Sequence, residues 1–324
     1  HKCTLFGSYE QIGPADFKES VEYWDSFANA LHRTSKAEKL CAVALVKRFA
    51  FDAKFEKDLE GSRLARVLDT ATIAATNWAE RYGIELPENF NGQLLHYPRK
   101  EEMFVKRFKE NESTDTAKAK QKFEKLRKIW DKQDEAPPTY YALLVMDGDK
   151  MGKWLSGKLG PTLRQCLSSE TAQKLDDSAL LGKTKTRPCP PQCQAAISEA
   201  LTNFSVVDVP KIVTNHGGFL VYSGGDDVMA LLPAKESIKC TLELKKAYEQ
   251  DYSEGALRMG SKATASAGLA IVHYKEALSF ALEIARDAEK AAKNAGRNRL
   301  AISVITGSGE EKTVVPWKTA STLQ

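Results

Sequence analysis

The sequence predicts an α+β protein in which a mostly helical domain precedes a ferredoxin-like palm domain of βαββαβ order. Three observations predict this fold class. The apolar run at residues 140–146 ends abruptly at Asp147. Two short apolar runs bracket the sequence Ser-Gly-Gly-Asp-Asp at residues 223–227, which is the pattern of a β-hairpin. Helix-like and strand-like segments then alternate to residue 305, in the order of a split βαβ arrangement.

The first part of the chain is predicted to be helical because its apolar residues recur at helical spacing. This holds for residues 37–51, 64–82 and 101–130, the last with an interruption near residues 111–116. Residues 131–138 are polar and end in two prolines, which cannot continue a helix. The predicted division is therefore a helical domain at 1–136, a palm domain at 137–310, and a tail at 311–324 that leads to a further C-terminal domain.

In the second part of the chain, predicted strands and helices alternate as in a sheet covered by helices. Residues 140–146 (YYALLVM) form a continuous apolar run, typical of a central strand that is buried on both faces. The elements that follow are a helix at 194–204, strands at 219–222 and 228–232, a helix at 235–250, a strand at 265–273, a helix at 275–294 and a strand at 299–305. The last helix and strand extend the βαββαβ unit.

Composition restricts the class of protein. The chain of 324 residues is 42% hydrophobic and 28% charged, an ordinary globular mixture. No apolar run approaches the roughly 18 to 20 residues of a membrane-spanning helix, so no membrane association is expected. The formal charge of +4 gives no bulk electrostatic argument for nucleic acid. Six scattered cysteines and no secretion signal favour the cytoplasm. The first residue is His1, so we expect a piece of a longer protein.

Three aspartates are predicted to form a metal site. Asp147 ends the central strand, and Asp226 and Asp227 occupy the hairpin turn. In a ferredoxin-like sheet the first and third strands are adjacent, so the hairpin brings its aspartates close to Asp147. Three carboxylates repel one another unless a cation compensates. Hard oxygen ligands suit Mg²⁺ or Mn²⁺, and two such ions would clamp a phosphoryl transfer. Asp147, Asp226 and Asp227 are therefore the expected catalytic and metal-binding residues.

The surrounding residues are expected to hold a nucleotide. The glycines of the hairpin let the backbone approach a base or ribose, and a glycine-containing loop after a strand directs N–H groups towards phosphates. Two cations near a helix end would meet triphosphate oxygens. The alternatives are that the Asp and Gly residues are ordinary turn residues, and that the cations close a helix C-terminus. The expected nucleotide-binding residues are Gly148, Asp149, Lys150, Met151, Gly152 and Lys153, Ser223, Gly224 and Gly225, and Lys293 with Arg297.

These motifs resemble known families. The Gly-Gly-Asp-Asp hairpin, the strand that ends at Asp147, and Ala-Lys-x-x-Gly-Arg-Asn at residues 292–298 resemble GGDEF-type nucleotide cyclases. The segments Asp-Gly-Asp-Lys-Met-Gly-Lys (147–153) and Tyr-Ser-Gly-Gly-Asp-Asp-Val-Met-Ala-Leu-Leu-Pro (222–233) are similar to the large palm-containing subunit of type III-B (Cmr) CRISPR RNA-guided effector complexes. This resemblance covers about residues 139–305.

The resemblance implies an activity and partners. It implies that ATP, with Mg²⁺ or Mn²⁺, is converted into cyclic or linear oligoadenylate with release of pyrophosphate. It also implies a neighbouring protein subunit, a guide RNA, and a target RNA that switches the palm on, so low turnover is expected from the isolated chain. Larger members of the family begin with an HD nuclease-like domain and continue into a C-terminal helical domain.

The N-terminal segment is similar to a zinc ribbon that has lost ligands. Family members carry two cysteine pairs that hold structural zinc. Here each pair lacks its second cysteine. Phe6 stands at that position three residues after Cys3, and Ala44 stands at it three residues after Cys41. Structural zinc needs four Cys or His ligands, so no stable zinc site is predicted. Completion of a site by His1 or His32 is the less favoured alternative.

Two other functions stay open. The first is a diguanylate-cyclase-like enzyme that uses GTP; against it, Asp227 is followed by Val228, where the GGDEF pattern has Glu and then Phe. The second is a nucleotide-binding scaffold that organises an RNA–protein complex without turnover. The retention of all three carboxylates argues against this second function.

Overall fold

The computed structural model describes residues 1–4, 7–31, 38–50, 68–84, 92–96, 100–111, 115–131, 136–160, 162, 164–176, 189–251 and 256–322. The chain divides into two compact units, His1–Val67 and Leu68–Gln324. The helices between residues 68 and 131 therefore share a unit with the sheet, whereas the sequence placed a boundary near residue 136.

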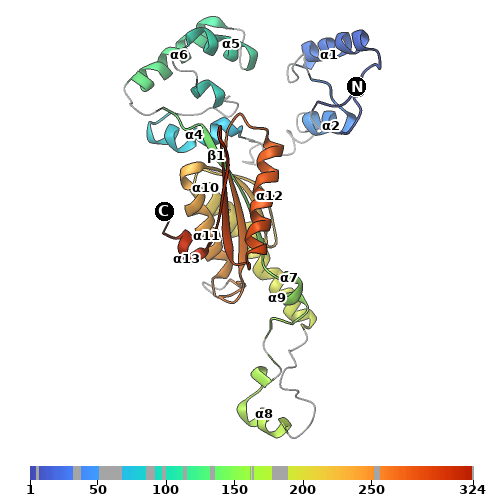
Figure 1. Ribbon diagram of the computed structural model, residues 1–324, viewed down its shortest axis with the longest axis vertical. Coiled ribbons are helices and arrows are strands. Elements are labelled where there is room, and N and C mark those ends of the chain that lie inside the picture. The colour runs from blue at the N-terminus through green and yellow to red at the C-terminus, as the bar shows by residue number, and fades with distance from the viewer. Residues whose placement is uncertain are drawn as a thin grey trace. The chain divides into compact units, whose positions relative to one another are not determined.

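A six-stranded sheet forms the centre of the second unit (Figure 1), with strand order β2-β3-β1-β4-β5-β6. Strand β1 lies between β3 and β4 and is antiparallel to both, while β4 and β5 are parallel. The first four positions of this order are those of a ferredoxin-like sheet, which confirms the predicted fold class. The strands are β1 (Tyr140–Gly148), β2 (Phe219–Gly224), β3 (Asp227–Pro233), β4 (Ala265–His273), β5 (Arg299–Thr306) and β6 (Gly309–Pro316).

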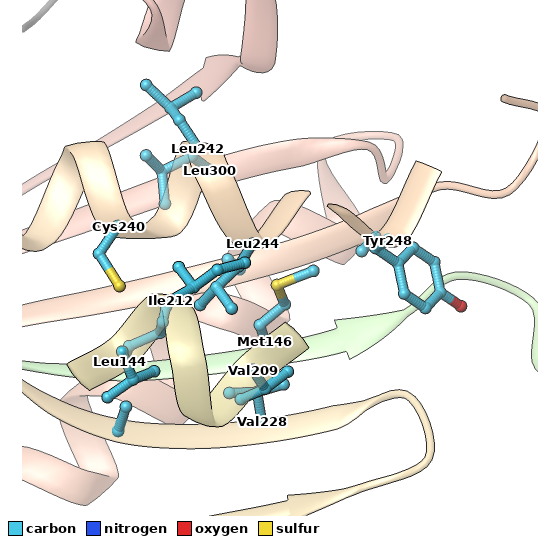
Figure 2. Packing of buried hydrophobic residues seen from close by; sticks show 14 of the residues in the cluster. Leu144, Met146, Val209, Ile212, Val228, Cys240, Leu242, Leu244, Tyr248 and Leu300 are labelled. Carbon is cyan, nitrogen blue, oxygen red and sulfur yellow. The ribbon is translucent and has the colours of Figure 1, made fainter. Parts of the chain in front are cut away.

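Strand β1 is apolar from Tyr140 to Met146 because both faces of the sheet are covered there. Leu144 and Met146 point into one buried cluster, and Tyr141 and Leu143 point into another. The first cluster contains residues of α10 (Val209–Asn215) and α11 (Ser237–Glu249), as Figure 2 shows for Leu144 and Met146 beside Val209 and Ile212. Side chains that alternate across a strand thus reach two separate cores.

The other face is covered by α4 (Thr70–Arg81) and α12 (Leu278–Asn294). Helix α12 packs directly on β4 at Gly268. A Cβ at this position would collide with the backbone of Ala285 and Glu289, so only glycine allows so close an approach. Helix α4 presents Ala71, Ile73 and Ala74 to the sheet. Further along the helix, Ala75, Trp78 and Ala79 belong to a third cluster with η3 (Gly92–His96), α5 (Glu101–Asn111) and α6 (Thr116–Asp131). Helix α4 is therefore a layer of the palm unit.

Strand β6 corrects the predicted end of the sheet. Residues 311–316, assigned to a tail from the sequence, pair with residues 299–304 of β5. Two residues, Gly307 and Ser308, separate β5 from β6, which is the loop length of a tight hairpin. The remaining short elements of the unit are α7 (Met151–Leu155), η4 (Arg164–Cys166), α8 (Ser169–Asp176), α9 (Pro191–Thr202), the π-helix η5 (Asn203–Asp208), η6 (Ala234–Glu236) and α13 (Trp317–Ala320).

The first unit contains α1 (Phe17–Leu31) and α2 (Ala42–Ala50). Cys3 and Cys41 lie in one buried apolar cluster with Trp24, Leu40 and Ala44. The Cys41 sulfur accepts a hydrogen bond from the backbone N–H of Ala44. Apolar packing thus surrounds both cysteines of the expected ribbon remnant. Phe6 and His32, which also entered that expectation, lie outside the described residues. Within the described segments of the chain, no helix is long and apolar enough to cross a membrane.

Candidate active site

The end of β1 and the β2–β3 hairpin bring three carboxylates together. Met146 pairs with Val228, so Asp147 at the end of β1 lies beside the start of β3. One carboxylate oxygen from each of Asp147, Asp226 and Asp227 lies within 4.8 Å of the others. Asp147 and Asp226 are partly buried, whereas Asp227 is exposed. The proximity expected from the fold is therefore present in the structure.

The hairpin turn depends on its two glycines. Gly225 has a φ of 66°, in the left-handed region that glycine adopts without strain. At Gly224, a Cβ would lie 2.7 Å from Cζ of the Tyr222 ring. The glycines thus permit both the tight turn and the placement of the Tyr222 ring, which is itself exposed.

Gly148 holds Asp226 against the end of β1. A Cβ at Gly148 would lie 2.8 Å from Oδ2 of Asp226 and would also collide with the hydroxyl of Tyr248. The backbone of Gly148 makes a hydrogen bond to the Asp226 carboxylate. Gly148 was expected to bind nucleotide; in the structure it is buried and is the position at which strand, hairpin and α11 meet.

The electrostatics of the cluster favour a bound cation. Burial raises the pKa of Asp226 above its ordinary value, and the neighbouring charge of Asp227 raises it further. Hydrogen bonds from the backbone of Asp226 and Gly148 act in the opposite direction. Burial also raises the pKa of the adjacent Tyr248. A divalent ion would relieve the repulsion between these carboxylates, and an all-oxygen set fits Mg²⁺ or Mn²⁺.

Lys293 is the cation that meets the cluster in this structure. Its ammonium group forms ion pairs with Asp147 and with Glu289, the latter at 2.6 Å between Nζ and Oε1. Burial, together with the positive charge of Arg297, lowers the pKa of Lys293. Burial and the charges of Asp149 and Asp227 raise the pKa of Glu289. A lysine thus occupies the position next to Asp147 where positive charge is needed.

Glu289 is a site residue that the sequence interpretation missed. It precedes Lys293 by four residues on α12, the spacing at which helix side chains pair. That spacing was visible, but it is common on exposed helices. Only the packing of α12 against β4 brings Glu289 to the acidic cluster.

The expected nucleotide-binding residues of the loop after β1 differ in their exposure to solvent. Lys150, Gly152 and Lys153 are exposed, and Met151 is partly buried and begins α7. Lys150 has a φ of 62°, a left-handed conformation that turns the chain sharply after the strand. Asp149 is 2% exposed and is hydrogen-bonded inside the protein. The lysines of this loop therefore face solvent, and Asp149 does not.

The expected nucleotide-binding residues of the hairpin and of the end of α12 also differ in exposure. The Ser223 hydroxyl is buried and finds no hydrogen-bond partner in the described part of the chain. Arg297 lies just beyond the end of α12, and its side chain is 44% exposed. The structure thus brings the aspartates, the β1 loop, the hairpin and the end of α12 to one edge of the sheet.

A ferredoxin-like sheet with this acidic strand end and Gly-Gly-Asp-Asp hairpin defines the second unit as a palm domain. Residues 140–301 match the family model described as Cas10/Cmr2, second palm domain. The chain belongs to the Cas10/Cmr2 family.

Relatives of known name agree with this assignment. The CRISPR system Cmr subunit Cmr2 of Pyrococcus furiosus is 34% identical over 293 residues, covering 84% of this chain and 32% of the relative. The Saccharolobus solfataricus CMR subunit Cmr2 is 34% identical over 58 residues, covering 18% of this chain and 6% of the relative. The chain therefore spans about a third of the length of the first of these relatives.

Solved structures of type III-B Cmr-beta have the same fold. The complex bound to cognate target RNA matches with a TM-score of 0.57 at 18% identity, covering 94% of this chain and 42% of the matched chain. The apo state matches with a TM-score of 0.60 at 17% identity, covering 97% and 44%. At these identities the likeness concerns the fold alone.

Proposed function

We propose that this palm binds ATP with divalent metal and joins adenylates into oligoadenylate, cyclic or linear, within the large subunit of a type III CRISPR effector complex. The observation that carries the proposal is the group of Asp147, Asp226 and Asp227, whose carboxylate oxygens lie within 4.8 Å of one another at the strand end and hairpin. Membership of the Cas10/Cmr2 family supports the same function.

The reaction is a nucleotidyl transfer. The 3′-hydroxyl oxygen of one adenylate forms a bond to the α-phosphorus of another ATP. The bond from that phosphorus to the oxygen bridging the α- and β-phosphates breaks, and pyrophosphate leaves. The hydroxyl proton passes to solvent. Asp147, Asp226 and Asp227 would hold Mg²⁺ or Mn²⁺, which supplies charge neutralisation and lowers the pKa of the attacking hydroxyl. Chemistry of this kind needs no separate protein general base.

The chain's own cations bind and orient the triphosphate. Arg297 is part-exposed beside the cluster and carries a planar fork of donors that suits phosphate oxygens. Lys293 pairs with Asp147 in the metal-free chain, and with metal held by the aspartates its ammonium group would be free to contact a phosphate. Lys150 and Lys153 are exposed on the loop after β1 and add positive charge on the same edge. No described atom would lie within 4 Å of a Cβ at Gly225, so a base or ribose could approach the backbone there.

Partners follow from the assemblies in which relatives occur. The matched type III-B Cmr-beta structure is a complex bound to cognate target RNA. We propose that this chain works with other Cmr subunits, a guide RNA and target RNA, and that target RNA raises its turnover. The chain alone would bind nucleotide but turn it over slowly.

Calorimetric titration tests the proposal. ATP and then GTP, each with Mg²⁺ or Mn²⁺, are titrated into the wild type, an Asp226→Ala/Asp227→Ala variant, and a Glu283→Ala/Asp287→Ala control that removes two carboxylates from the exposed side of α12. The expected result is metal-dependent ATP binding that the hairpin variant loses and the control keeps.

Other outcomes separate the alternatives. A preference for GTP would favour a diguanylate-cyclase-like enzyme. Binding of neither nucleotide, or equal binding by the hairpin variant, would refute the metal assignment and favour the scaffold. Oligoadenylate formation is then measured in the assembled complex with and without target RNA.

A further inference from the structure

Asp149 is the most thoroughly bonded carboxylate near the candidate site. It lies two residues after Asp147 and is 2% exposed. Thr264 Oγ1 and the backbone N–H of Asn298 donate to its Oδ2 at 2.8 and 2.9 Å. Ser266 Oγ donates to its Oδ1 at 2.8 Å. A buried carboxylate is tolerated when its oxygens are satisfied in this way, so the geometry leaves Asp149 no role as an open nucleotide ligand.

These bonds join three segments that are distant in sequence. Asp149 belongs to the loop after β1, Thr264 and Ser266 to the start of β4, and Asn298 to the turn between α12 and β5. The first two segments are also held by the β1–β4 ladder, in which Gly148 pairs with Ala265. The turn of residues 296–298 is not part of that ladder. The Asp149 carboxylate therefore ties this turn to the end of β1.

The turn has a backbone that needs such support. Gly296, Arg297 and Asn298 have φ angles of 118°, 64° and 51°. A non-glycine residue is disfavoured in the left-handed region, and asparagine tolerates it better than arginine does, so the strain of this turn lies mainly at Arg297. A backbone N–H that donates to a carboxylate makes a stronger hydrogen bond than one between neutral groups, so the contact from Asn298 offsets part of the strain. The bond from the Asn298 N–H to Asp149 thus stabilises an otherwise disfavoured turn.

This turn carries the cation expected to bind triphosphate. Nε of Arg297 lies 3.9 Å from Oδ1 of Asp149, so the buried charge also restrains the guanidinium group. Lys293, one turn earlier on α12, contacts Asp147. The distance between the metal-binding end of the site and its phosphate-binding end therefore depends on the Asp149 contacts.

We infer that Asp149 is a positioning residue, which touches no nucleotide but fixes the turn carrying Arg297 relative to Asp147. The inference rests on the proposed function, because Arg297 must act on a triphosphate for its position to matter. It also replaces the expectation that Asp149 itself contacts the nucleotide.

Two substitutions at this position separate geometry from charge. Asp149→Ala removes all three accepted hydrogen bonds. Asp149→Asn keeps a carbonyl oxygen for Thr264 and Asn298, and its NH₂ group donates to Ser266, whose hydroxyl can accept. Asp208→Ala is the control, since Asp208 is a part-buried carboxylate of the same unit that is also ion-paired, with 2.7 Å between its Oδ2 and Nη1 of Arg258. Thr264→Val, which removes one donor, serves if Asp149→Ala does not fold.

Three measurements on the full chain decide the matter: Mn²⁺ affinity without nucleotide, ATP affinity with Mn²⁺, and deuterium exchange of the peptide covering residues 294–300. In Asp149→Ala we expect faster exchange at Asn298 and ATP binding weaker by about tenfold, the size of one lost charge-assisted contact. Mn²⁺ affinity should change by less than about twofold, because the β1–β4 ladder still holds Asp147. Asp149→Asn should restore protection of the turn and most of the ATP affinity.

Each contrary result has a definite meaning. Wild-type ATP affinity in Asp149→Ala would overturn the inference, as would an equal loss of ATP affinity in Asp208→Ala. A wild-type chain that binds no ATP would refute the proposed function instead. In that case deuterium exchange of the peptide 294–300 decides alone. If Asp149→Ala loses protection and Asp149→Asn restores it, the positioning role is upheld. If protection is unchanged in Asp149→Ala, the positioning role is overturned.

Discussion

Gly148→Ala tests how closely the strand end and hairpin are packed. The added methyl group would lie 2.8 Å from Cβ and Oδ2 of Asp226 and closer still to the Tyr248 hydroxyl. Tyr248 is 1% exposed and its ring packs edge-on against Phe204 at 5.1 Å between ring centroids, so it has no room to retreat. Asp226 must move instead. Overpacking of this kind costs about 1 to 3 kcal/mol.

Urea unfolding and Mn²⁺ titration measure the effect. We expect Gly148→Ala to lose about 1 to 3 kcal/mol of unfolding free energy and to bind Mn²⁺ more weakly, because Asp226 leaves the cluster. Gly307→Ala is the matched control: no atom lies within 4 Å of its added Cβ, and it stands in the loop between β5 and β6. Wild-type stability together with wild-type Mn²⁺ affinity in Gly148→Ala would refute the reasoning.

Three further predictions concern charge. Lys293→Met removes the ammonium group that competes for Asp147, so Mn²⁺ affinity without nucleotide should rise while ATP affinity falls; the exposed Lys290→Met should change neither, and a weaker Mn²⁺ affinity in Lys293→Met would contradict the competition. Burial raises the pKa of Asp226, so the folded chain binds its proton more tightly than the unfolded chain, and ionisation costs stability as pH rises through the raised value. Without metal, Asp226→Asn should therefore melt at a higher temperature than the wild type at pH 7, with the difference vanishing in acid; a lower melting temperature at pH 7 would contradict this. Burial lowers the pKa of His96 to about 4, so the unfolded chain is protonated first and stability falls as pH drops from about 6.5 to 4. His96→Gln cannot ionise and should show a shallower acid limb in unfolding, whereas an unchanged limb would assign the acid sensitivity to other groups.

The sheet and the acidic cluster could be predicted because strong local signals point to them. The apolar run of β1 ends at Asp147, and the glycine turn separates two short strands, so the order of the sheet follows from the ferredoxin-like rules. Once that order is set, Asp226 and Asp227 must approach Asp147. The distribution of charged residues along the chain contributed little to predicting the sheet or the acidic cluster.

The roles of neighbouring residues could not be predicted from spacing. Asp147 and Asp149 are the same residue type two positions apart, which on a strand would place them on one face. Strand β1 ends at Gly148, between them, so the two side chains no longer alternate as on a strand. The Asp147 carboxylate lies with those of the hairpin, and the Asp149 carboxylate is buried and hydrogen-bonded to Thr264, Ser266 and Asn298. Local sequence carries no sign of this divergence.

Helix α4 was assigned to a separate helical domain and strand β6 to a tail, because the neighbours that each element packs against cannot be identified from its own residues. Helix α4 is apolar on two sides, with Ile73 towards the sheet and Trp78 towards the other helices, and periodicity alone does not say which neighbour lies on which side. Strand β6 is charged and exposed over most of its length, so it lacks the apolar alternation that identifies a strand. Its place in the sheet comes from pairing with β5.

The most direct test of the central claim is a crystal of the chain grown with Mn²⁺ and a non-hydrolysable ATP analogue, examined by anomalous scattering at the manganese edge. We predict an anomalous peak within coordination distance of Asp147 and at least one hairpin aspartate, with the triphosphate next to Arg297 and Lys293 displaced from Asp147. Analogue bound elsewhere, or manganese absent from the cluster while Lys293 keeps its ion pair with Asp147, would contradict the account.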